Sequence, residues 1–187
     1  KMVSGFLPDT LYFKEESVMR ILVAIISLCA VVSISFASED IPDQYPQSIL
    51  YSKPVEVIPG VWSAIGATAP PTYENSGHNN NLSFIITGEG VVVFNGGGSY
   101  LLAKSLHDEI KKITDQPVVL VADENGQGHA FLGNSYWAEQ NVPILAHEEA
   151  AHEIETRGYD VLDRMQTLNK EKAEGTKVVG PTEVFSD

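Results

Sequence analysis

Polar residues with metal-binding side chains directly follow an apolar run near the middle of the chain. Val118-Val119-Leu120-Val121 precedes Asp123, Glu124 and His129. Functional groups often lie where buried strands end, because the strand holds the backbone while the loop exposes the side chains. Carboxylate oxygens and imidazole nitrogens are ligands of zinc. The pattern therefore offers Asp123, Glu124 and His129 as candidate metal ligands, with Gln127 able to orient a water molecule or a substrate.

The segments before this site predict strands and one helix. Residues 55–62, 82–87 and 91–94 are rich in β-branched and aromatic residues, and Gly88-Glu89-Gly90 between the last two favours a hairpin. Residues 99–114 carry Leu102, Leu106, Ile110 and Ile113 on one helical face, with Ser99 as the N-cap.

The segments after residue 118 alternate between strand and helix patterns. We expect a strand at residues 118–121, a helix at 130–140, a strand at 143–146 and a helix at 148–172 that is interrupted at Gly158, before a final segment that enters another strand. Hairpins followed by such alternation predict an α/β fold, a mixed sheet with packed helices.

Several of these segments resemble, in order and spacing, the opening strands of the metallo-β-lactamase superfamily. They are Ile58-Pro59-Gly60-Val61-Trp62, Asn81-Leu82-Ser83-Phe84-Ile85-Ile86, Gly90-Val91-Val92-Val93-Phe94-Asn95-Gly96-Gly97 and Ile144-Leu145-Ala146-His147-Glu148. The match covers roughly residues 55–173. The resemblance implies an αββα sandwich made of two similar halves, of which this chain holds mainly the first half.

The superfamily's metal motif is changed in this chain. Members carry H-x-H-x-D-H directly after a buried strand, and here the segment reads E-N-G-Q-G-H. Glu124 stands at the first His, Gly126 at the second, Gly128 at the Asp and His129 at the last His. The resemblance implies zinc held through His129 and Glu124, or manganese or iron because a carboxylate is a harder ligand. The alternative is a glycine-rich turn that holds no metal, in which His129 caps a helix or bonds backbone.

Two further positions follow from the resemblance. Asn95 stands where the family usually has an Asp that supports the metal loop, and His78 lies in a loop that often overhangs the active site. The resemblance is closest to periplasmic metallohydrolase-like proteins of sulfur oxidation and quinoprotein systems. It implies a hydrolase with a modified metal site acting on a small ester, thioester, lactam or sulfur-containing substrate; the alternative is a non-catalytic scaffold or accessory binding protein in sulfur or quinoprotein metabolism.

The N-terminal segments read as processing signals. Met19-Arg20, an apolar run and Ser35-Phe36-Ala37 predict a signal peptide at residues 19–37, since the run is short for a bilayer span of roughly 20 residues. Residues 1–18 are expected to be non-native upstream translation, because Lys14-Glu15-Glu16 can be encoded by a ribosome-binding sequence. Residues 38–54 would form an N-terminal arm and residues 55–187 a domain truncated at its C-terminus. The mature protein is therefore expected to be periplasmic or secreted and to carry no membrane anchor.

The composition of the chain limits the classes of partner that it is expected to bind. The 187-residue chain has a net charge of −13, which argues against nucleic acid because phosphates need Lys and Arg. A small-molecule substrate is the expected partner. Self-association is also expected, because a half sandwich leaves one apolar sheet face without its partner layer.

Overall fold

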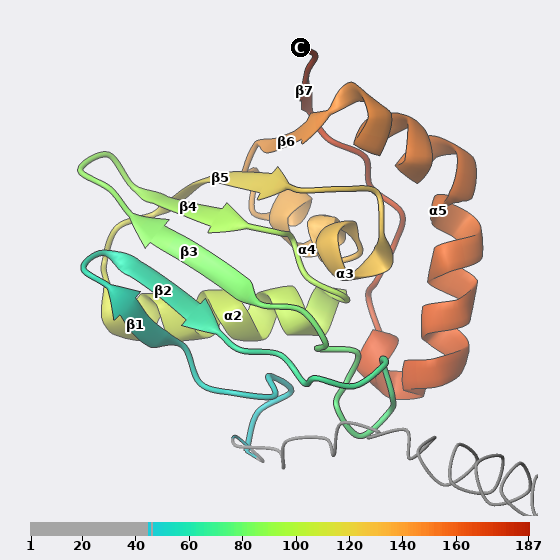
Figure 1. The fold of residues 1–187 in the computed structure, drawn as a ribbon, viewed down its shortest axis with the longest axis horizontal. Helices are drawn as coiled ribbons and strands as arrows, with labels where there is room; N and C mark the ends of the chain where they lie inside the picture. Colours follow the sequence, from blue (N-terminus) through green and yellow to red (C-terminus); the bar gives the residue numbers. More distant parts are fainter. Residues whose placement is uncertain (1–44, 46) are drawn as a thin grey trace, which may run out of the picture. The chain divides into compact units, whose positions relative to one another are not determined.

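The computed structural model describes Tyr45 and residues 47–187 (Figure 1). The expected upstream translation at residues 1–18, the signal peptide at 19–37 and residues 38–44 and 46 of the arm lie outside the described residues. Among those that are described, no helix is both long and apolar enough to cross a membrane.

A mixed sheet of seven strands forms the centre of the domain, and its strands are ordered as they occur in the sequence. They are β1 (Val55–Ile58), β2 (Val61–Ala64), β3 (Leu82–Ile86), β4 (Val91–Phe94), β5 (Val118–Asp123), β6 (Ile144–His147) and β7 (Glu183–Phe185). The first four strands pair antiparallel and β4 to β7 pair parallel. The predicted α/β class with a mixed sheet is confirmed.

Helices connect the parallel strands. They are α2 (Tyr100–Ile113), α3 (Gly128–Phe131), α4 (Asn134–Glu139), α5 (Glu148–Asn169) and the 3-10 helix η1 (Lys170–Ala173). Ser99 caps α2 as predicted, since its hydroxyl accepts a hydrogen bond from the Leu102 N–H at 3.1 Å. Helix α5 runs past α3 beyond the end of β5 (Figure 1).

The main core lies between one face of the sheet and helices α2 and α4. Phe84, Val93, Val121 and Ile144 are register neighbours across four strands, and all are buried. They belong to one cluster with side chains of α2 and with Trp137 of α4. Leu50, in the segment expected to be a polar arm, is fully buried in the same cluster.

The opposite face of the sheet is apolar and partly open to solvent. Val61, Ile85, Val92 and Leu120 are neighbours in register on this face. In the next row Phe94 pairs with Ala122, and Ile85 and Phe94 stay 42% and 47% exposed. We call these residues the open sheet face.

Two helix predictions were wrong in detail. Residues 130–140 are not one helix: α3 and α4 are separated at Leu132 and Gly133, and the Gly133 N–H donates to the Gly97 carbonyl. The expected interruption at Gly158 does not occur. Gly158 is needed for packing instead, because a Cβ there would lie 2.8 Å from Val178 Cγ1.

Candidate functional site

The candidate site lies where β4 and β5 end. These strands are parallel, so their carboxyl ends meet at one edge of the sheet. Asn95 follows β4 with a φ of 69°, a left-handed conformation that Asn tolerates. Its side-chain Oδ1 accepts a hydrogen bond from the Glu124 N–H at 3.1 Å. The β4 end thereby holds the backbone of the loop after β5.

Asp123 ends β5 and points into the interior. Strand alternation places it on the same face as buried Val121, and only 6% of it is exposed. Its carboxylate accepts hydrogen bonds from the Gly96 N–H at 3.1 Å and from Asn134 Nδ2 at 2.7 Å. Burial raises the pKa of Asp123 from 3.8 to about 7, although both hydrogen bonds act in the opposite direction. Asp123 ties the two strand ends to α4.

His78 is also buried in the interior. Its Nδ1 accepts a hydrogen bond from the Tyr51 N–H at 2.9 Å, and none of the side chain is exposed. Burial lowers the pKa of His78 from 6.5 to about 4. Its neighbours Gly77 and Asn79 reach the pocket described below, whereas the His78 ring packs against the Tyr51 backbone.

Asp123 and His78 should give the folding stability opposite pH dependences. Because folding raises the pKa of Asp123, the folded protein binds the extra proton, and stability is lost as the pH rises from about 4 to about 7. Folding lowers the pKa of His78, so its contribution is lost as the pH falls from about 6.5 to about 4. In urea unfolding between pH 4 and 8, Asp123→Asn should leave stability rising with pH, and His78→Gln should leave it falling.

The exposed Asp163→Asn on α5 is the control for the loss of a carboxylate and should follow the wild type. Parallel pH profiles for the wild type and both buried-site variants would contradict this assignment.

Glu124 and His129 are brought together at the surface. Glu124 Oε1 lies 3.3 Å from His129 Nε2, with side chains 42% and 23% exposed. The carboxylate can accept the Nε2 hydrogen, which leaves Nδ1 as the ring atom able to accept a proton. This geometry suits a carboxylate-oriented imidazole.

The two glycines of the motif are explained by α5. A Cβ on Gly126 would lie 2.4 Å from Glu153 Cβ, and one on Gly128 would lie 2.8 Å from Val161 Cγ1. The Gly126 N–H also donates to Glu153 Oε2 at 3.2 Å. Helix α5 therefore occupies the space that the family's second His and its Asp would need.

The donors present do not complete a zinc centre. A catalytic zinc site uses about three protein ligands and one open position. Glu124 and His129 supply two, and nowhere in the described part of the chain do three or more His, Cys, Asp or Glu side chains gather closely enough to hold a metal ion. These residues alone do not fit the metal that the resemblance implies.

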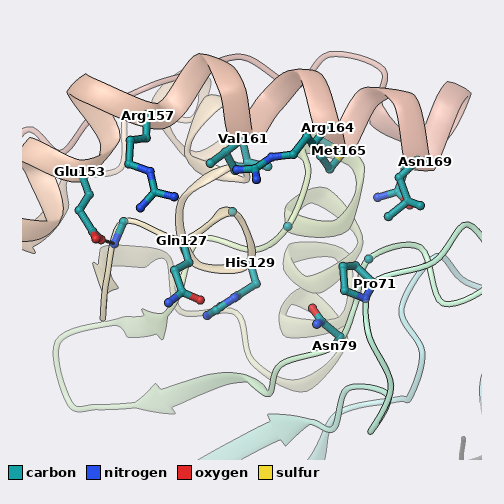
Figure 2. Close-up of a pocket in the computed structure, with 16 residues that line it drawn as sticks. Pro71, Asn79, Gln127, His129, Glu153, Arg157, Val161, Arg164, Met165 and Asn169 are labelled. Atoms are coloured by element: carbon teal, nitrogen blue, oxygen red, sulfur yellow. Dashed lines mark hydrogen bonds between the residues drawn. The ribbon is translucent and has the colours of Figure 1, made fainter.

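A pocket of about 520 Å³ lies between α5, residues 126–129 at the start of α3 and the loop at residues 71–79. Figure 2 shows Gln127 and His129 on one side of it, below the side chains of α5. Of the predicted site residues, Gln127 and His129 line the pocket. Glu124 contacts His129, and Asn95 holds the backbone of Glu124 by a hydrogen bond. Sequence reasoning missed the α5 side chains of the pocket, although their spacing of three or four residues places them on one helical face.

Solved structures of metallo-β-lactamases share this fold. The DIM-1 metallo-β-lactamase exposed to ceftazidime matches with a TM-score of 0.51 and 8% identity, over 72% of this chain and 51% of that one. The metallo-β-lactamase from Hirschia baltica matches with a TM-score of 0.50 and 13% identity, over 71% of this chain and 51% of that one. No protein-family model and no curated protein matches the sequence.

These matches show the fold. The described domain has the architecture of part of a metallo-β-lactamase, a mixed sheet with packed helices, and the chain spans about half the length of the metallo-β-lactamase structures it matches. The predicted fold is therefore confirmed.

Proposed function

We propose that the protein is an exported metallo-β-lactamase-fold protein that binds a small organic molecule in the pocket beneath α5, as an accessory binding protein. The observation that carries this proposal is the pocket itself. It has about 520 Å³ and lies at the carboxyl ends of β4 and β5, where α/β proteins place their ligands. Gln127 and His129 line it.

A metal-dependent hydrolase is the second candidate, favoured by the contact between Glu124 and His129. These residues stand at the first and last ligand positions of the superfamily motif. Zinc, or manganese or iron, would need a third protein ligand in addition to this pair. The substrate would then be the small ester, thioester, lactam or sulfur compound that the resemblance implies.

Binding can be tested by thermal unfolding against a library of anionic, cationic and neutral small molecules. We expect at least one class to raise the melting temperature of the wild type, because a ligand at a hundred times its Kd stabilises by about 2.7 kcal/mol. Leu168→Trp, which fills the pocket, should abolish the shift. Tyr159→Trp, on an exposed part of the same helix, should keep it. No shift in the wild type, or an equal shift in Leu168→Trp, would contradict binding in this pocket.

Metal content of the same samples separates the two candidates. The protein is purified from the periplasm of a bacterial host, where its N-terminal sequence should begin at Ser38. The binding proposal expects less than one metal ion per chain and a ligand shift that survives removal of metal by a chelator. One ion per chain, lost in His129→Ala and weakened in Glu124→Gln together with hydrolysis, would favour the hydrolase instead.

A further inference from the structure

The pocket is elongated along α5. Its helical wall is one face of that helix, with Glu153 and Arg157 at one end and Asn169 at the other (Figure 2). Arg157 and Asn169 are twelve residues apart in α5, or about 18 Å at 1.5 Å per residue. A ligand that fills the pocket is therefore long rather than round.

Two arginines line this wall in a strongly acidic protein. Arg157 and Arg164 lie on the pocket face of α5, although the chain carries a net charge of −13. Glu153 and Asp160 lie one turn from them, yet neither guanidinium forms a salt bridge with any residue of the described domain; the Arg164 Nε donates to the Asp160 backbone carbonyl. Unpaired guanidinium groups bind carboxylates and other planar anions.

Asn169 presents an unsatisfied amide at the far end. It is completely buried and lines the pocket, and neither its Oδ1 nor its Nδ2 has a hydrogen-bond partner among the residues described. A buried polar group without a partner costs about 1–3 kcal/mol. A hydrogen-bonding group on a ligand would remove that cost.

Apolar side chains line the rest of the pocket. Along α5, Val161 lies between the two arginines, and Met165 and Leu168 lie between Arg164 and Asn169; Leu132 adds to this apolar lining. The facing wall includes Gly77, Gly98 and Gly128. A Cβ on Gly77 would lie 2.8 Å from Asn169 Nδ2 and one on Gly128 would lie 2.8 Å from Val161 Cγ1, so the missing side chains let this wall approach α5 closely.

We propose that this pocket binds an elongated organic anion, with a carboxylate or similar acidic group at Arg157 and Arg164, an apolar body, and a hydrogen-bonding group that reaches Asn169. The inference rests on the proposed binding function and names the chemical class of its ligand. Because the charge, the apolar body and the distal polar group are read from different residues, each can be tested separately.

The test is isothermal titration of the whole chain with ω-hydroxydecanoate, decanoate and the uncharged decanol. The hydroxy acid should bind best and decanol at least about tenfold more weakly, the effect of losing one charge-assisted contact. Arg157→Gln with Arg164→Gln should weaken binding of both acids at least tenfold and remove its salt dependence. Lys53→Gln removes a similar exposed charge outside the pocket and should change neither.

Asn169→Leu tests the distal end. It should bind decanoate and ω-hydroxydecanoate equally, while the chain stays at least as stable because an unsatisfied amide is lost. Equal affinity of the wild type for decanol and decanoate, or double-arginine variants that bind the acids normally, would overturn the anion assignment. If a library compound still binds and Leu168→Trp still prevents its binding, the proposed binding function is retained and only the anion assignment is rejected. If no library compound binds, both the binding function and the anion assignment are rejected.

Discussion

Gly133→Ala is expected to lower the free energy of unfolding by about 4 kcal/mol or more, a large fraction of the stability of a typical domain. A Cβ at Gly133 would lie 1.9 Å from the Gly96 carbonyl oxygen and 2.6 Å from its carbon. Both are backbone atoms, so relief requires the β4 end and α4 to separate. Separation would also break the hydrogen bond from Gly133 N–H to the Gly97 carbonyl and the one from Trp137 Nε1 to the Gly96 carbonyl.

Gly88→Ala is the matched control, because a Cβ at Gly88 would meet no atom within 4 Å. Its unfolding free energy should change by less than about 0.5 kcal/mol. Urea unfolding followed by tryptophan fluorescence measures both variants. Similar midpoints for Gly133→Ala and the wild type would mean that the close contact between these backbones does not hold the site together.

The 187-residue chain is expected to self-associate through the open sheet face. Ile85 and Phe94 are 42% and 47% exposed there, next to other apolar side chains in register. Burial of apolar area is worth about 25 cal/mol per Å², so two such faces gain free energy by covering each other. Sedimentation velocity at increasing protein concentration should show dimers or larger species.

Ile85→Lys combined with Phe94→Lys should shift the population toward monomer, since both side chains lie on the open sheet face. The control Tyr159→Lys changes a side chain that is 73% exposed on α5, and it should leave the association unchanged. A wild-type chain that sediments as a single monomer at all concentrations would show that this face is not an association surface.

Local patterns in the sequence were sufficient for much of the fold. Runs of β-branched and aromatic residues predicted the strands, and the spacing of Leu102, Leu106 and Ile110 with Ser99 before them predicted α2 and its cap. The break between α3 and α4 was missed because its cause is tertiary. At the break the Gly133 N–H donates to the Gly97 carbonyl, and a Cβ on Gly133 would lie 1.9 Å from the Gly96 carbonyl oxygen, so the break is where the chain packs against the end of β4.

The candidate site was predictable only in part. Placing Glu124 and His129 side by side follows from their position in one short loop. The inward direction of Asp123 could have been read from strand alternation, since Val121 is two residues earlier. The contribution of Arg157, Arg164 and Asn169 depends on where α5 lies over that loop, which no local pattern specifies.

The packing of α5 against Gly126 and Gly128 also constrains the order in which the motif can change. A histidine at position 126 or an aspartate at position 128 would collide with Glu153 or Val161 before it could reach a metal ion. At position 126 the nearest atoms include Glu153 Cβ and, at 3.0 Å, the Ala150 carbonyl oxygen, so shortening Glu153 alone would not make room and α5 itself would have to shift. Adding ligands at positions 126 and 128 therefore depends on changes in α5 and not on the loop alone.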